Sequence, residues 1–371
     1  MNAAIQLKEQ YFMMQLVAEP MFKPAPFHSV MPRFFLALLL LVPGLSRAQK
    51  PFTYRIRGTI GALNAPYKVY LASSERVDSA TLTNGAFALT GTTDLPTRAD
   101  LVVQAHGYHR HAVQTNATSV FLEPTPVVVH STGNLRDAAT TITGGPLTAE
   151  HQQLYAAVPP HATPEQYAHA YAAFISTHPT SWVSLMALWD MGVFVKRQYA
   201  DVAPLYAALS PELKSSRPGR VYGELVQGLK ATAVGQPAPN FTKKTPAGQA
   251  VSLADYRGKY VLLAFWHSCA TCRTENPNLV NAYQAFKGPK FDLLGVSLDT
   301  ENNRERWLKA IADDHLVWTQ VWDQEGTKRE VERLYGYPGT PMNMLIDPGG
   351  KIVAANLQGP ELHAALARFL K

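Results

Sequence analysis

The chain has 371 residues, of which 46% are hydrophobic and 17% are charged, as in a globular protein with ample apolar material to bury. This length exceeds one ordinary core, so two or three domains are expected. The formal net charge is +6, from 34 basic and 28 acidic residues, and no run of Lys and Arg stands out. The charge pattern therefore gives no support to nucleic-acid binding.

The N-terminal region has the layout of a secretory signal that begins at Met31. An arginine precedes nine apolar residues, 34–42, and small side chains follow them before Gln49. Nine apolar residues are too few to span a bilayer. We predict an upstream extension at residues 1–30, a signal peptide at 31–48, and an exported chain with no integral membrane segment once mature. The alternative is an internal apolar helix behind a genuine N-terminal arm.

Residues 49–145 are predicted to form a small all-β, sandwich-like domain. Runs rich in β-branched and aromatic residues, such as FTYRIRGTIG and TSVFLEP, alternate with Gly, Pro and Asn at a spacing of about 8–12 residues. This spacing favours an antiparallel sandwich or barrel. His106, His109 and His111 suggest a metal site, but no carboxylate or cysteine accompanies them. Exposed histidines on a strand are the simpler interpretation.

Residues 146–233 are predicted to be a helical segment. Apolar residues recur at three- and four-residue spacing in PEQYAHAYAAFIS and SWVSLMALWDMGVF, and Pro, Ser or Thr stands at the start of each run. An aromatic stripe could line a ligand groove or form the buried seam of packed helices, and the seam is favoured. The stripe consists of Tyr167, Tyr171, Phe174, Trp182 and Trp189. The pattern indicates no function for this segment.

Residues 235–371 alternate between strand and helix patterns. GKYVLLAFW and KFDLLGVSLD are continuous apolar runs typical of buried strands, and the helical runs CATCRTENPNLVNAYQAF and RERWLKAIADD follow them. Two further strands, MNMLID and KIVAANLQG, are expected to pair across the tight turn at 348–350. This order predicts a thioredoxin-like α/β domain.

Cys269 and Cys272 are the only cysteines, and they lie where the first of these strands runs into a helix. A structural zinc site needs four ligands, and His267, His315 and His363 lack the spacing to complete one. A structural disulfide that closes so short a loop would stabilise the fold by only about 2 kcal/mol in the chain-entropy model. A thiol at a helix N-terminus faces unpaired N–H groups that favour thiolate, and its partner lies one turn along. A redox centre is therefore favoured, with no metal and no cofactor.

Several motifs of the last 137 residues carry a family resemblance. They are GQPAPNF, GKYVLLAFW, GTPMNMLID and CxxCRxExP, the last formed by Cys269, Cys272, Arg273, Glu275 and Pro277. Together they resemble the TlpA/ResA-type thioredoxin-like disulfide reductases of the bacterial envelope, within the wider AhpC/TSA superfamily. The β-rich region in front is similar to a domain of unassigned function that often precedes such modules.

The resemblance implies a thiol-disulfide oxidoreductase of the periplasm or cell envelope. Cys269 would attack a substrate disulfide as thiolate, and Cys272 would then attack Cys269 and release the reduced substrate. The implied partners are disulfide-containing envelope proteins and a membrane thiol donor that re-reduces the pair. No residue selects a particular substrate or fixes the net direction.

The resemblance also implies roles for residues around the thiols. Glu275 would tune thiol protonation, although a plain first-turn acid that stabilises the helix is the alternative. Trp266, Thr340 and Pro341 would contact the substrate. Pro338 competes with Pro341, but only Pro341 immediately precedes the apolar strand, so we predict a cis Thr340–Pro341 bond close to the first cysteine.

The approach to the first cysteine departs from the family pattern. Only His267 and Ser268 separate Trp266 from Cys269, so an imidazole is expected near the thiol, with a solvated loop histidine as the alternative. A peroxidase of the same superfamily needs Thr three residues before its cysteine, and Trp266 stands there instead. A rival of another class is a binding or scaffold protein of the envelope in which the thiols only sense redox state.

Overall fold

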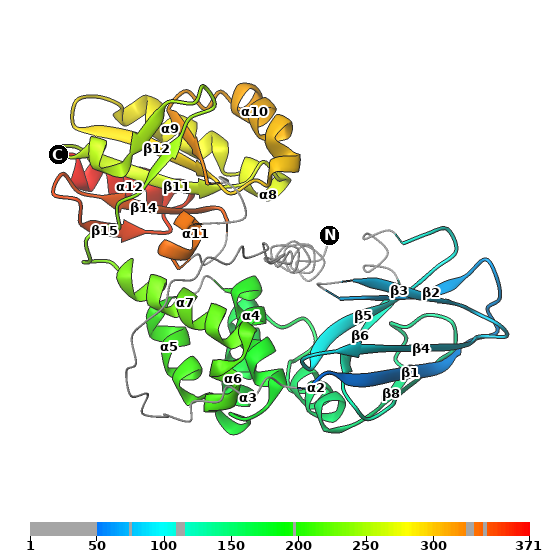
Figure 1. Ribbon diagram of the computed structural model, residues 1–371. Coiled ribbons are helices and arrows are strands. Elements are labelled where there is room, and N and C mark those ends of the chain that lie inside the picture. Colours follow the sequence, from blue (N-terminus) through cyan, green and yellow to red (C-terminus); the bar gives the residue numbers. More distant parts are fainter. Residues whose placement is uncertain (1–49, 74–75, 109–115, 196–197, 324–329, 337–339) are drawn as a thin grey trace, which may run out of the picture. The chain divides into compact units, whose positions relative to one another are not determined.

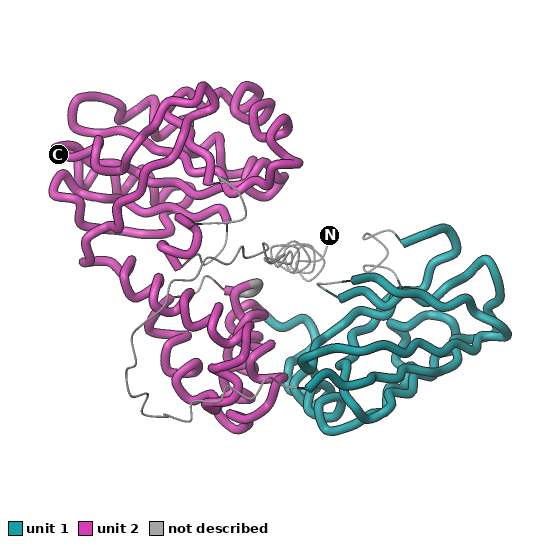
Figure 2. Tube along the Cα trace, viewed as in Figure 1, with its two compact units in different colours: residues 1–162 teal, residues 163–371 magenta. Residues whose placement is uncertain are grey.

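The computed structural model describes residues 50–73, 76–108, 116–195, 198–323, 330–336 and 340–371. It divides into two compact units, residues 1–162 and 163–371 (Figure 2). The expected signal peptide, His109, His111 and Pro338 lie outside the described residues. In the part that is described, no helix has the length and apolar character needed to cross a membrane.

The first unit is a sandwich of two four-stranded sheets (Figure 1). One sheet has the order β4 (Ala86–Thr93), β1 (Phe52–Ile60), β7 (Val127–Ser131), β8 (Thr141–Thr143). The other has the order β3 (Val77–Thr81), β2 (Lys68–Ala72), β5 (Thr97–Gln104), β6 (Ala117–Leu122). Ile56 and Val129 of the first sheet share one buried core with Val69 and Leu101 of the second. The predicted β-sandwich is thus confirmed.

One strand pairing differs from the predicted antiparallel arrangement. β1 and β7 run parallel, with Ile56 opposite Val127 and Gly58 opposite Val129. The strands of the second sheet lie between β1 and β7 in sequence, so the chain crosses to that sheet and can return in the original direction. A period of two in the sequence shows which face a strand buries but not the direction of its neighbour.

Helix α2 (Pro146–Ala156) closes the first unit and begins where a helix was predicted. Its first turn rests on Glu123, whose buried carboxylate accepts the N–H groups of Gly145 at 3.0 Å, Leu147 at 3.2 Å and Thr148 at 3.1 Å. An acid from the sandwich thus satisfies the N–H groups that a helix N-terminus leaves unpaired. This contact ties α2 to the end of β6.

The second unit starts with a helical segment, as predicted. Its helices are α3 (Pro164–Thr177), α4 (Trp182–Phe194), α5 (Tyr199–Ala208), α6 (Pro211–Ser215) and α7 (Arg217–Ala231). Tyr171, Phe174 and Trp182 of the aromatic stripe are buried, and Trp189 meets Tyr222 edge-on with ring centroids 5.0 Å apart. The stripe is therefore the seam of packed helices, the interpretation that the sequence favours.

The helical segment packs closely on the end of α11 (Glu330–Leu334). A Cβ atom on Gly228 of α7 would lie 2.3 Å from the backbone nitrogen of Gly336, so the contact requires glycine. Thr232 also donates its hydroxyl to the carbonyl of Tyr335 at 3.3 Å. Accordingly α3 to α7 share a compact unit with the α/β region, whereas α2 belongs to the first unit. The domain boundaries expected near residues 145 and 234 stay predictions.

A seven-stranded sheet forms the centre of the α/β region (Figure 1). Its order is β10 (Ala250–Ser252), β9 (Thr242–Lys244), β13 (Thr319–Trp322), β12 (Phe291–Ser297), β11 (Tyr260–Trp266), β14 (Met342–Ile346), β15 (Ile352–Ala355). β11, β12 and β13 are parallel, and β14 runs antiparallel to β11. The predicted thioredoxin-like α/β fold is confirmed, including the pairing of β14 with β15.

Both faces of the sheet are covered, which explains why its central strands are continuously apolar. Leu263 and Phe265 of β11 point into one core, and Leu262 and Trp266 point into the other. The remaining helices are α8 (Ala270–Arg273), α9 (Asn276–Phe286), α10 (Arg304–Asp313) and α12 (Gly359–Phe369). Helices α9, α10 and α12 pack on the face that contains Trp266. The chain leaves β11 at its carboxyl end and enters α8 with the two cysteines.

Candidate active site

Two free thiols lie where β11 gives way to α8. Cys269 is the residue that caps α8, and it is partly exposed, whereas Cys272 is fully buried. Their Sγ atoms are 3.7 Å apart, within the range of a sulfur hydrogen bond. α8 has only four residues, so its macrodipole is small, and local N–H groups rather than a long helix act on the thiols.

Cys269 is the thiol that ionises readily. A hydrogen bond with the Cys272 side chain, supported by the N–H groups of Cys272 and Thr271, lowers the pKa of Cys269 to about 6. Partial burial and the negative charge of Asp299 oppose this shift. Above pH 6 Cys269 is therefore largely thiolate, which is the form that acts as a nucleophile.

Cys272 has the opposite tendency. Its hydrogen bond to Cys269, burial, and repulsion from the Cys269 thiolate raise the pKa of Cys272 well above its ordinary value. Two contacts favour its thiolate: the Thr340 side chain, and the backbone N–H of His267, which donates to Sγ at 3.3 Å. The pair thus consists of a partly exposed thiolate and a buried thiol that donates to it.

The segment before β14 meets the strand end that leads to the thiols. The Thr340–Pro341 bond is cis, as predicted, and both residues are partly exposed. His267 Nδ1 and Thr340 Oγ1 are 2.9 Å apart. The imidazole expected near the thiols is therefore bound to Thr340 rather than left as a solvated loop side chain.

Asp299 is a site residue that sequence reasoning missed. It is 3% exposed and follows β12, the neighbour of β11. Its carboxylate accepts the Ser268 N–H and the Ser268 hydroxyl, each at 2.8 Å, and the Ser297 hydroxyl at 3.0 Å. An acid directly after a buried parallel strand is the signal that could have found it, because the carboxyl ends of parallel strands meet at one edge.

The loop between Trp266 and Cys269 is held from several sides. Asp299 binds Ser268, and Arg306 of α10 donates its Nε–H to the Ser268 carbonyl at 3.1 Å. Trp322 at the end of β13 donates its indole N–H to the Asp299 carbonyl at 2.7 Å. These contacts attach the loop before Cys269 to the ends of strands β12 and β13.

Glu275 lies beside the thiol-bearing helix but binds elsewhere. One carboxylate oxygen accepts the Gly359 N–H at 3.2 Å, and the other accepts the Asn278 side-chain amide at 3.1 Å. The acid that acts on the pKa of Cys269 is Asp299. Glu275 thus joins the start of α9 to the start of α12, and its predicted part in thiol protonation stays a prediction.

Trp266 is buried beneath the site. Its ring is 3% exposed, and its indole N–H donates to the Gln320 side chain at 3.1 Å. The ring supports the end of β11 from below by packing. A contact between Trp266 and substrate stays a prediction, and burial of the ring gives it no support.

The described residues hold no group of three or more His, Cys, Asp or Glu side chains placed to bind a metal ion. His106, the one described member of the histidine triplet, is exposed. The chemistry that the site offers is that of its two sulfur atoms.

Two regions of the chain match known families. Residues 234–355 match the AhpC/TSA family, and residues 54–150 match a domain of unknown function, DUF4369. Thiol-disulfide oxidoreductase ResA of Bacillus subtilis is 30% identical over 135 residues, which cover 36% of this chain and 72% of that protein. Thioredoxin-like protein YneN of the same organism is 31% identical over 120 residues, or 32% of this chain and 68% of that protein.

A solved structure also matches the α/β region. It is the thioredoxin domain of a thiol-disulfide oxidoreductase from Bacteroides vulgatus, with 40% sequence identity and a TM-score of 0.35. The match covers 38% of this chain and 99% of that one.

The contact between the two thiols yields a first prediction. In the wild type, the rate of Cys269 alkylation by iodoacetamide should rise with pH and reach half its maximum near pH 6, since raising the pH through the pKa of about 6 converts thiol to thiolate. Cys272→Ala should move this midpoint upward, because it removes the hydrogen bond that lowers the pKa most. Cys272→Ser keeps a donor and should give an intermediate midpoint. Equal alkylation rates at the two wild-type cysteines would contradict the assignment.

The charge on Asp299 yields a second prediction. Asp299→Asn should lower the pKa of Cys269 further, because the negative charge that opposes ionisation is removed. Loss of an acceptor for Ser268 should also reduce the free energy of unfolding by about 1–3 kcal/mol. Thiolate absorbance as a function of pH measures the first effect.

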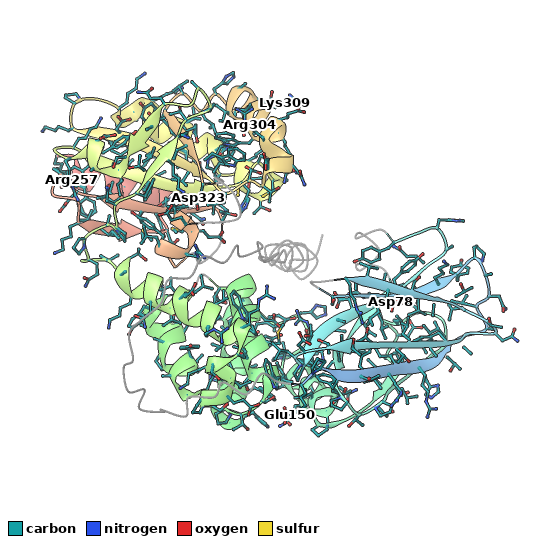
Figure 3. All side chains as sticks on the ribbon, in the orientation of Figure 1. Asp78, Glu150, Arg257, Arg304, Lys309 and Asp323 are labelled. Carbon is teal, nitrogen blue, oxygen red and sulfur yellow. The ribbon has the colours of Figure 1, made fainter. Side chains whose placement is uncertain are left out.

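Asp323→Asn is the matched control for that measurement. Asp323, labelled in Figure 3, is a fully buried acid at the end of β13 that pairs with Lys243 at 3.0 Å. The control should destabilise the fold without lowering the pKa of Cys269. An unchanged or raised pKa in Asp299→Asn would show that Asp299 does not act on the thiol through its charge.

Proposed function

Because this chain belongs to the thiol-disulfide oxidoreductases of the AhpC/TSA family, we propose that it reduces disulfides of envelope proteins through a dithiol–disulfide cycle at Cys269 and Cys272. The observation that carries the proposal is the inequality of the two thiols. One is accessible with a pKa of about 6, and the other is buried 3.7 Å away with a raised pKa. A reductase needs one sulfur that attacks first and a second that attacks only afterwards.

In the first half of the proposed cycle, the Cys269 thiolate attacks one sulfur of the substrate disulfide. A mixed disulfide forms between Cys269 and the substrate, and the other substrate sulfur leaves as a thiolate. Formation of this bond removes the negative charge from Cys269. The repulsion that raises the pKa of Cys272 is then lost, so the resolving thiol ionises more readily at the step that needs it.

In the second half, the Cys272 thiolate attacks Cys269 Sγ and releases the second substrate thiolate. The substrate gains two electrons, and the protein is left with a Cys269–Cys272 disulfide. A membrane thiol donor, implied by the family, would return the pair to the dithiol state. The chain needs no cofactor for this exchange because the electrons move with the sulfur atoms.

The loop at Thr340 and Pro341 is the proposed contact for the substrate segment. Thr340 is partly exposed, and its side chain forms hydrogen bonds with His267 and Cys272. A substrate chain whose sulfur reaches Cys269 would pass this loop, where backbone groups can pair with an extended segment irrespective of its side chains. Such a contact suits a reductase that accepts several proteins.

The cell envelope is the proposed location. The signal-like run that begins at Met31 supports export, with a mature chain that starts at or near Gln49. Disulfides persist in oxidising compartments, so substrates of a disulfide reductase are available there.

Catalysed reduction of insulin, with a small dithiol as the electron source, tests the proposed function. The full chain should accelerate precipitation of the reduced insulin chains, whereas Cys269→Ser and Cys272→Ser should give only the rate of the dithiol alone. Glu361→Gln, on α12, is a control that should keep the wild-type rate. If Cys269→Ser retained full activity, or if the wild type gave no acceleration, the proposal would fail.

A further inference from the structure

The proton of Cys272 poses a problem for the second half of the cycle. Cys272 must attack as a thiolate, yet it is fully buried and its pKa is raised. Bulk water cannot reach it directly, so a neighbouring group has to accept the proton. This question rests on the proposed function, because it arises only if Cys272 resolves a mixed disulfide.

The two acids near the thiols are already occupied. Both oxygens of Glu275 accept hydrogen bonds, from Gly359 and Asn278. Both oxygens of Asp299 accept hydrogen bonds from Ser268, and one accepts a further bond from Ser297. These donors stabilise the ionised form of each carboxylate.

A third route leads through Thr340 to His267. The Thr340 side chain acts on Cys272 by hydrogen bonding, and its Oγ1 lies 2.9 Å from His267 Nδ1. Imidazole is the side chain whose ordinary pKa allows it to gain and lose a proton near neutral pH. His267 is partly exposed, so a proton on its ring can pass to solvent.

We propose that Thr340 and His267 form a proton relay that deprotonates Cys272 as it attacks the mixed disulfide. The Thr340 oxygen accepts the Cys272 proton while its own hydroxyl proton passes to His267 Nδ1, with the ring initially protonated at Nε2. Cys272 becomes a thiolate and His267 an imidazolium. The sulfur–sulfur bond between Cys269 and Cys272 then forms, the substrate leaves as a thiolate, and the imidazolium returns its proton to that thiolate or to water.

The surrounding contacts suit this relay. After the transfer, the Thr340 hydroxyl donates to the Cys272 thiolate, as does the His267 backbone N–H at 3.3 Å. Among the described residues, charged groups at the neighbouring Ser268 are the carboxylate of Asp299, which accepts the Ser268 N–H, and Arg306, which donates to the Ser268 carbonyl. His267 is thus a positioning residue that acts through Thr340, the group that touches the reacting sulfur.

Oxidation of the reduced full-length protein by one equivalent of dithiobis(nitrobenzoate), followed by stopped-flow absorbance, separates the two attacks. The first nitrothiobenzoate released reports attack by Cys269, and the second reports attack by Cys272. His267→Asn keeps a group able to bond Thr340 but cannot take up a proton. Thr340→Val removes the hydroxyl, Thr340→Ser restores it, and His363→Asn on α12 is a matched histidine control.

His267→Asn and Thr340→Val should slow the second release by about tenfold or more near neutral pH, with the first release unchanged. Thr340→Ser and His363→Asn should stay within about twofold of the wild type, and the rate deficits of His267→Asn and Thr340→Val should shrink at alkaline pH, where Cys272 ionises more readily without a proton acceptor. The relay would be overturned if the second release kept its wild-type rate in both variants, or if both releases slowed equally at every pH. A wild type that released only one equivalent would contradict the proposed cycle itself, and the relay with it.

Discussion

The hydrogen bond between the two sulfur atoms is the interaction on which the proposed chemistry of the site depends. A distance of 3.7 Å between Sγ atoms makes each thiol the main influence on the pKa of the other, in opposite directions. The lowered pKa of Cys269 would not follow from burial, because burial raises the pKa of any thiol. The exposed sulfur ionises because the buried one donates to it. Closure of a disulfide between them needs only a short approach, because both sulfurs already lie side by side.

The fold sets this contact by bringing several strand ends to one edge. β11, β12 and β13 are parallel, so the segments that follow them, with Ser268, Asp299 and Asp323, emerge at the same side of the sheet. β14 runs the other way, so the segment before it carries Thr340 to the same place. Each face of the sheet is covered by a buried core that stabilises the fold. The loops at this edge can therefore hold reactive groups, because the stability of the fold does not depend on their packing.

The sequence allowed prediction of features that depend on short-range pattern. The apolar run of β11 and the strand after Pro341 follow from periodicity and motif. The single helix expected from Cys269 to Phe286 is instead divided into α8 and α9, with Cys269 at the N-cap of α8. The family resemblance and the β-sandwich were right for the same reason, since the relevant motifs lie close together along the chain. The parallel pairing of β1 with β7 was not predicted, because the two strands are distant in sequence. Alternation of apolar and polar residues also does not show whether a neighbouring strand runs parallel or antiparallel.

The same limit applies within the site. Asp299 is 30 residues from Cys269 in sequence and Thr340 is 73 residues from His267, so no local pattern connects either pair. The contact with Thr340 could not be read from the motif, although the departure at His267 was visible. The substrate contact expected of Trp266 from its place before the cysteines stays a prediction, and the residue is only 3% exposed.

In the proposed cycle, Cys269 is the nucleophile and Cys272 is the resolving thiol. The most direct measurement is mass-spectrometric mapping of the mixed disulfide formed when Cys272→Ser meets a disulfide-bonded peptide, with Cys269→Ser as the comparison. A stable adduct at Cys269 is expected in the first variant, and little or no adduct at Cys272 in the second, because that thiol is buried and its pKa is raised. Equal adduct formation in the two variants, or adducts on Cys272 alone, would contradict it.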